Sequence, residues 1–219
     1  YWRFSVVDKQ LQENKEISKN YWIIKRVFDI CFSSLAIVLF APVGLIIALI
    51  IKLDSKGSVL YVHERMGKNF TTFQMYKFRT MQSDADKVKN VFTEKQKEEW
   101  RKNFKVVDDP RITRVGRILR STSLDELPQL WNVLKGDMSL IGPRPIIRQE
   151  LLQYGNNQAK LLSVLPGITG YWQAYARNEC GYPHRIDMEL YYVDHAGFAL
   201  DTRIFFATIG RILSRKGAA

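Results

Sequence analysis

The sequence predicts a mostly helical α+β domain attached to one side of a membrane (monotopic), and three observations support this class. A charge-free stretch runs from Ile30 to Ile51 and is long enough to enter a bilayer. Two short segments with strand-like composition follow it. Beyond them, most of the chain carries apolar residues at helical spacing.

Composition limits the function classes. The chain has 219 residues, 46% of them hydrophobic and 25% charged, so one domain can bury a real core. Its net charge of +11 suits nucleic acid, an anionic membrane surface or phosphorylated substrates. The two cysteines, Cys31 and Cys180, predict neither a disulfide framework nor a zinc site. This cysteine usage fits the reducing cytoplasmic side of a membrane.

Residues 1–20 are expected to be a linker or the remnant of a longer N-terminal region, and residues 21–56 a membrane segment. Pro42 and Gly44 interrupt the apolar run near its middle, which predicts a helix-break-helix. Cations flank both ends: Lys25 and Arg26 before, Lys52 and Lys56 after. Positive charge on both sides favours a re-entrant hairpin that returns to the cytoplasmic face, with Pro42 at the break. The alternatives are a spanning helix and a buried helix of a soluble protein.

Residues 57–219 are expected to form a cytoplasmic domain that opens with two strands, 59–63 and 73–81. Lys77 and Arg79 would lie on one face of the second strand, where two cations make a phosphate clamp or an ordinary solvated face.

Residues 82–105 have the charge of a solvated helix. They contain Asp84 and Asp86, a DxD pattern found in metal-dependent glycosyltransferases but more typical here of a first helical turn. The next predicted helix, 111–120, carries four arginines, of which Arg120 is nearest in sequence to a pair of carboxylates.

That pair, Asp125 and Glu126, stands where another helix should begin. Ser123 and Glu126 form a capping-box pattern, whereas Pro128 favours a start at Asp125. In either case Asp125 is expected at the positive end of a helix, where it stays ionised and where phosphate also binds. An ionised carboxylate beside phosphate is suited to nucleophilic attack on phosphorus.

Four motifs in order resemble the bacterial sugar transferase family, the monotopic phosphoglycosyl transferases that act on polyprenyl phosphate. They lie at 77–81 (KFRTM), 123–130 (SLDELPQL), 134–145 (LKGDMSLIGPRP) and 166–173 (PGITGYWQ). The resemblance runs from about residue 21 to residue 217.

The resemblance implies transfer of sugar-1-phosphate from a UDP-sugar to undecaprenyl phosphate, with Asp125 as the nucleophile and Glu126 helping to orient it. Both carboxylates would hold Mg²⁺. The implied nucleotide-sugar-binding residues are Lys77, Arg79, Arg120, Pro143, Arg144, Pro145, Arg177 and Glu189. The chain departs from the family pattern at Ala41, Ala176 and Glu189, where the family has Ser, Gly and in some relatives Asp.

The C-terminal part predicts a short helix to about residue 160, a tight turn at 166–170 and an amphipathic helix at 201–216, interfacial or packed on the core. Anionic lipids are expected partners and nucleic acid is not, since no nucleic-acid-binding motif is present. The sequence leaves the sugar and the oligomeric state open, a homo-oligomer included. Two rival functions remain: a DxD-type glycosyltransferase and a non-catalytic basic module at the membrane surface.

Overall fold

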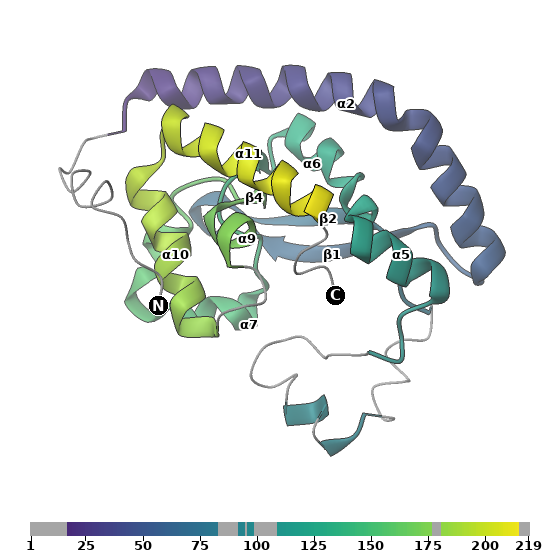
Figure 1. Cartoon of the computed structure of the whole chain (residues 1–219). Helices are drawn as coiled ribbons and strands as arrows, with labels where there is room; N and C mark the ends of the chain where they lie inside the picture. The colour runs from purple at the N-terminus through teal and green to yellow at the C-terminus, as the bar shows by residue number, and fades with distance from the viewer. Residues whose placement is uncertain (1–16, 83–91, 95, 99–108, 177–180, 215–219) are drawn as a thin grey trace.

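The computed structural model describes residues 17–82, 92–94, 96–98, 109–176 and 181–214. Helices dominate and the strands are short, which confirms the predicted α+β class (Figure 1). The helices of four residues or more are α2 (Lys19–Asp54), α5 (Arg114–Thr122), α6 (Gln129–Lys135), α7 (Arg148–Leu151), α8 (Gln158–Leu161), α9 (Tyr171–Tyr175), α10 (Tyr182–His195) and α11 (Phe198–Ser214). The strands are β1 (Leu60–Met66), β2 (Thr72–Phe78), β3 (Ser139–Ile141) and β4 (Gly167–Thr169), and 3₁₀ turns occur at η1 (Lys68–Phe70), η3 (Leu124–Glu126) and η4 (Leu152–Asn157).

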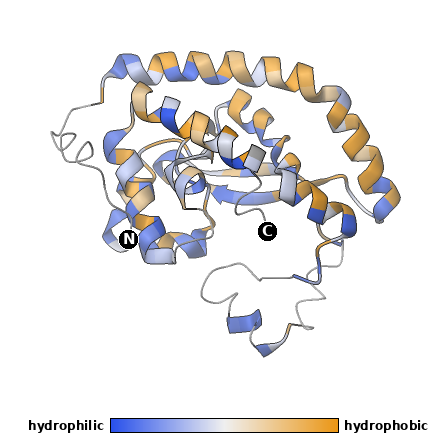
Figure 2. Ribbon diagram, viewed as in Figure 1, coloured by the Kyte–Doolittle hydropathy of each residue, from blue (hydrophilic) through white to orange (hydrophobic). Residues whose placement is uncertain are grey.

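Helix α2 lies along one side of the domain and bends in its C-terminal part (Figure 1). It is one continuous helix of 36 residues with Pro42 inside, whereas the sequence predicts a helix-break-helix at that proline. A proline within a helix removes one hydrogen bond and crowds the preceding turn, which accounts for a bend. By length and composition α2 is apolar enough to cross a membrane. Large apolar side chains such as Val38, Leu45 and Leu53 are more than 70% exposed along it, and Figure 2 shows the apolar surface that results.

The N-terminal half of α2 is fastened to the domain by polar side chains on one buried stripe. The ammonium group of Lys25 lies 2.6 Å from a carboxylate oxygen of Asp201 in α11. Asp29 accepts a hydrogen bond of 3.0 Å from the amide of Leu140 in β3. Arg26 donates to the carbonyl oxygens of Val133 and Leu134 in the last turn of α6, where the negative end of the helix dipole favours a cation.

The C-terminal end of α2 is fastened by Arg79. Its guanidinium group donates to the carbonyl oxygens of Ser55 and Lys56 at 2.7 and 2.8 Å and to the Ser55 hydroxyl at 3.0 Å. A cation at this position complements the negative end of the helix dipole. Arg79 is buried by these contacts, so it does not lie beside Lys77 as a second arm of a phosphate clamp.

Strands β1 and β2 form the predicted antiparallel hairpin, with Tyr61 paired to Lys77 and Arg65 paired to Phe73. The prediction of a tight turn at 166–170 is wrong, because residues 167–169 are strand β4, which pairs in parallel with β3. The pairing is close: a Cβ on Gly167 would lie 2.1 Å from the amide nitrogen of Gly142, and one on Gly170 2.0 Å from the carbonyl oxygen of Gly142. Only glycine permits such an approach.

The main core lies between α2, α6, β3, α10 and α11, around Val133, Met138, Tyr192 and Ile204, each at most 1% exposed. Helix α11 therefore packs on this core, and Phe206 on α11 remains 65% exposed. The core-packing role predicted for this helix is confirmed, and the interfacial role stays a prediction. Figure 1 shows α11 and α6 beneath α2, with the hairpin on their other side.

Candidate active site

A cavity of about 330 Å³ opens between the hairpin, the turn that holds the acid pair, and helices α2 and α11. Its charged wall contains Arg65, Lys77, Glu126 and Arg144. Its apolar wall is built from α2 and α11 by Phe32, Ala36, Phe40, Phe205, Ile209 and Ile212. The cavity therefore joins an ion-binding end to an end suited to hydrocarbon.

The acid pair lies on the 3₁₀ turn η3, between α5 and α6. The predicted capping box is wrong: Ser123 closes α5 in a left-handed conformation (φ 57°), and its side chain makes no capping bond to η3. Pro128 precedes the first residue of α6, a position at which its missing N–H costs nothing. The proline, rather than the serine, thus decides where α6 begins.

Asp125 is buried and Glu126 lines the cavity. The ammonium group of Lys77 lies 2.7 Å from Glu126 and 4.0 Å from Asp125. Burial raises the pKa of Asp125 to about 6, Lys77 opposes the rise, and the charge of Glu126 adds to it. Desolvation thus outweighs the favourable charges around Asp125, but with a pKa of about 6 the carboxyl group is still mostly ionised at neutral pH, as the sequence predicts.

Arg120 does not line the cavity, but its charge acts on Asp125. Its Nε donates to the hydroxyl of Thr80 at 2.9 Å. Burial lowers the pKa of Arg120, and the charges of Asp125 and Asp109 oppose that change. Helix α5, which carries Arg120, docks closely on the chain after β2, since a Cβ on Gly116 would lie 2.1 Å from the carbonyl oxygen of Thr80.

The Pro143-Arg144-Pro145 segment follows β3 and is held by β4. The amide of Gly167 donates to the carbonyl oxygen of Pro143 at 2.8 Å. Both prolines are buried; Pro145 and the half-buried Arg144 line the cavity. Arg144 and Glu126 thus line the same cavity, and the nucleotide-sugar-binding role implied for Arg144 stays a prediction.

Other predicted site residues lie elsewhere. Glu189 does not line the cavity; it is 1% exposed and accepts hydrogen bonds from Tyr154 and Arg185. Arg79 is engaged with the end of α2, as described above. Arg177, Asp84 and Asp86 lie outside the described residues.

Sequence reasoning missed Arg65, which lines the cavity on the charged side. A usable signal existed: Arg65 is four residues from Tyr61, the partner of Lys77, so strand periodicity places Arg65 and Lys77 on one face of the hairpin.

Within the described part of the chain, no cluster of three or more His, Cys, Asp or Glu side chains has the arrangement of a metal site. The acid pair offers two carboxylates. Magnesium is commonly bound by one or two carboxylates together with substrate phosphates, so this donor set fits Mg²⁺.

The fold and the site define a class of protein: an α+β domain with one long apolar helix, whose cavity joins paired carboxylates and cations to an apolar wall. Such a cavity offers contacts both to a charged group and to an apolar chain. The model of the family described as "Bacterial sugar transferase" matches residues 20–215, and the chain belongs to that family.

Relatives agree with this assignment. The chain is 44% identical to an uncharacterized sugar transferase of Haemophilus influenzae, over 95% of this chain and 45% of the relative. It is 39% identical to the exopolysaccharide production protein ExoY of Sinorhizobium fredii, over 94% of this chain and 93% of the relative. It is also 39% identical to the undecaprenyl-phosphate galactose phosphotransferase of Salmonella typhimurium, over 94% of this chain and 44% of the relative. The chain thus spans less than half of two of these relatives and nearly all of the third.

Proposed function

We propose that this protein transfers sugar-1-phosphate from a UDP-sugar to undecaprenyl phosphate, releasing UMP and starting synthesis of a surface polysaccharide. The observation that carries the proposal is the single cavity in which Lys77, Glu126 and Arg144 meet an apolar wall from α2 and α11. A water-soluble donor needs the charged end, and a lipid-linked acceptor needs both ends. The Salmonella relative is named for transfer to the same lipid carrier.

The reaction proceeds in two displacements at phosphorus. A carboxylate oxygen of Asp125 attacks the β-phosphorus of the UDP-sugar, and the bond to the oxygen bridging the two phosphates breaks, so that UMP leaves with the electron pair. An oxygen of the polyprenyl phosphate then attacks the phospho-aspartyl phosphorus and displaces Asp125. With its pKa near 6, Asp125 is mostly ionised at neutral pH and more basic than an exposed aspartate.

At the charged end of the cavity, cations compensate negative charge and bind phosphate, and Glu126 takes part in metal binding. Lys77 and Arg120 offset negative charge that gathers around Asp125, and Arg144 has the planar geometry that suits a phosphate group. Asp125 and Glu126 would hold Mg²⁺, which when bound neutralises charge on the phosphoryl group.

We further propose that α2 enters and leaves the membrane on the cytoplasmic side, where cations flank both of its ends. The support is that one domain contacts both ends: Asp201 pairs with Lys25 near the start, and Arg79 bonds the carbonyl oxygens at the end. A helix crossing the bilayer would carry its ends to opposite sides, about 30 Å apart.

The nucleophile is tested with Asp125→Asn and radiolabelled UDP-sugar. We expect neither turnover nor a labelled protein adduct, whereas Asp194→Asn, which changes a half-exposed aspartate, should keep both. A stable adduct on Asp125→Asn would refute the assignment.

The nucleotide product separates the rival functions. A screen of UDP-sugars with polyprenyl phosphate should release UMP; a DxD-type glycosyltransferase would release UDP, and a binding module would release neither. The same screen identifies the sugar.

Membrane topology is tested by single cysteines at exposed Ser18 and Ser58, with Cys31 and Cys180 replaced by serine. A membrane-impermeant thiol reagent should label both positions in inside-out vesicles and neither in right-side-out vesicles. Labelling from opposite sides would overturn the re-entrant arrangement.

A further inference from the structure

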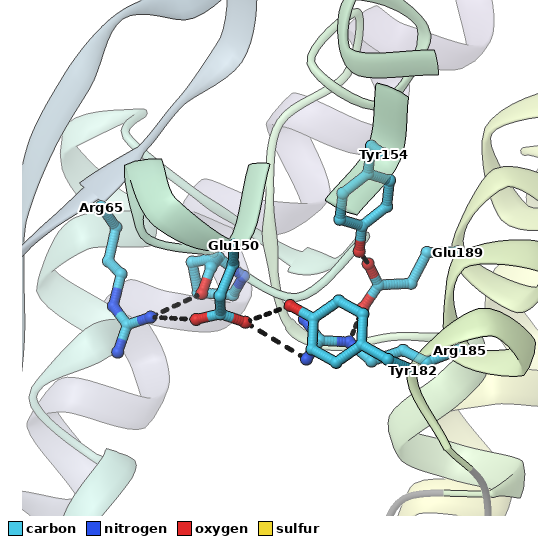
Figure 3. Close-up of polar contacts among 7 residues, drawn as sticks. Arg65, Glu150, Tyr154, Tyr182, Arg185 and Glu189 are labelled. Carbon is cyan, nitrogen blue, oxygen red and sulfur yellow. Dashed lines mark hydrogen bonds and ion pairs between the residues drawn. The ribbon is translucent and has the colours of Figure 1, made fainter. Parts of the chain in front are cut away.

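A buried network of charged and hydroxyl side chains, shown in Figure 3, meets the cavity at Arg65. Glu150 lies at its centre, between Arg65 on one side and Tyr182 and Arg185 on the other. Figure 3 also shows Arg185 reaching Glu189, which Tyr154 contacts from its far side. The proposed chemistry uses none of these side chains.

The network fixes the position of Arg65. One of its terminal nitrogens donates to Glu150 and to the carbonyl oxygen of Pro145, each at 3.3 Å. Glu150 is itself held by the hydroxyl of Tyr182 at 2.7 Å and by Arg185 at 3.3 Å. Because Glu150 is only 4% exposed, Arg65 is bound to a rigid anion rather than to a solvated one.

Arg65 and Arg144 form a pair of neighbouring cations on the cavity wall. Burial, followed by the positive charge of Arg144, lowers the pKa of Arg65 to about 10, so Arg65 remains charged at neutral pH. The Nε atoms of both arginines are buried, and neither has a hydrogen-bond partner among the described residues. A buried N–H donor without an acceptor is unfavourable, and a bound ligand can supply the missing acceptor.

The charges of the network do not cancel. Arg65, Arg144 and Arg185 act on Glu150, and Glu189 adds the other carboxylate, so three cations face two anions. Burial alone would raise the pKa of Glu150, but the charges of Arg144 and Arg185 outweigh it and hold the pKa below its ordinary value. The two carboxylates balance only two of the three arginines, so the network carries a net charge of one positive beside the cavity.

We propose that Arg65 is a substrate-binding residue which, with Arg144, forms a phosphate subsite separate from the acid pair, and that Glu150 is its positioning residue. The ligand is a phosphate group of an organic phosphate: the planar guanidinium groups suit its oxygens, and its charge balances the network. Within the proposed function, on which this inference rests, the group belongs to the nucleotide or to the lipid acceptor.

Binding measured without turnover tests the subsite. Arg65→Gln is titrated with UDP, and separately with undecaprenyl phosphate in detergent micelles, with the phosphate-free polyprenol as the blank. We expect Arg65→Gln to weaken one of the two ligands about 10- to 100-fold, which identifies the source of the phosphate, and Arg65→Lys to weaken it less. Arg148→Gln, which removes an exposed arginine two residues from Glu150, is the matched control and should bind like the wild type.

Glu150→Gln tests the positioning role. The variant keeps the size of the side chain but loses the charge that holds Arg65, so the same ligand should bind more weakly, and steady-state kinetics should show a raised KM for it with kcat changed less. A loss of thermal stability with unchanged affinity would assign Glu150 to folding alone and overturn this role.

The outcomes are separable. Wild-type affinity of Arg65→Gln and Arg65→Lys for both ligands would overturn the subsite. Should Arg65→Gln fail to fold, the comparison rests on Arg65→Lys, which retains the charge but not the fork of donors. Wild-type protein that binds a phosphate through Arg65 yet transfers no sugar phosphate would refute the proposed function and leave the subsite standing.

Discussion

The ammonium group of Lys77 lies 4.0 Å from a carboxylate oxygen of Asp125. It is also 2.7 Å from Glu126, so one cation serves both carboxylates and limits the rise in pKa that burial imposes on Asp125. The ionisation of Asp125 therefore depends on a side chain from a different element, strand β2.

Removing that cation should shift the pH dependence of the reaction. Lys77→Met keeps most of the side-chain volume and removes the charge, so the pKa of Asp125 should rise above about 6. Because the ionised carboxylate is the nucleophile, activity rises with pH through this pKa. We expect the acidic limb of the kcat/KM profile to move to higher pH and the rate at pH 7 to fall at least tenfold.

Lys160→Met is the control for that measurement, because Lys160 pairs with Asp194 at an exposed site. Its profile should match that of the wild type. A Lys77→Met variant with lower activity and an unmoved acidic limb would show that Lys77 acts on the substrate rather than on Asp125.

Asp125 should also lower the stability of the folded protein at neutral pH. Its pKa is about 6 in the folded protein against an ordinary 3.8, so between these values the folded state binds more protons and stability falls as pH rises. This difference between the two pKa values corresponds to a loss of folding stability on the order of 3 kcal/mol above pH 6. Asp125→Asn should therefore be more stable than the wild type at pH 8.

That advantage should shrink as the pH falls from 6 to 4, because the wild-type carboxyl group becomes neutral in the folded state. Unfolding curves of both proteins at pH 8 and pH 4.5 measure it. An advantage of equal size at both values would mean that burial of the charge is not its cause.

Part of this architecture is visible in the sequence and part is not. The apolar run, Pro42 and the alternating strands predict α2 and the hairpin, because local spacing encodes them. The parallel pairing of Ser139 with Gly167 joins segments far apart in the chain, and no local pattern encodes it. Arg79 shows the same limit: its motif suggests phosphate, whereas its partners are carbonyl oxygens just after the end of α2, which only the folded chain brings near.

Arg79 should accordingly affect folding more than binding. Arg79→Met removes charged hydrogen bonds from the buried end of α2, and we expect a loss of about 2–4 kcal/mol in the free energy of unfolding in detergent. Affinity for UDP should change little. Arg114→Met, at an exposed position on α5, should leave both quantities unchanged. A large loss of UDP affinity at unaltered stability would restore Arg79 to the nucleotide site.

The pair of Lys25 and Asp201 should behave as a single coupled unit that holds α2 to α11. Lys25 is 8% exposed, and its side chain lies 2.6 Å from Asp201, which also accepts hydrogen bonds from Tyr21 and Tyr192. Removing one partner of a buried pair costs about 3–5 kcal/mol, because a charge is left uncompensated. Lys25→Met should cost less than Asp201→Asn, because two hydroxyl groups still satisfy Asp201.

The double variant Lys25→Met/Asp201→Asn should lose clearly less than the sum of the single losses, since neither charge remains. Unfolding free energies of the four proteins in detergent give the coupling, which we expect to exceed about 2 kcal/mol. The exposed pair Lys160–Asp194, treated in the same way, should give less than about 1 kcal/mol. Additive losses at Lys25 and Asp201 would mean that apolar packing alone, not this ion pair, fastens the start of α2 to the domain.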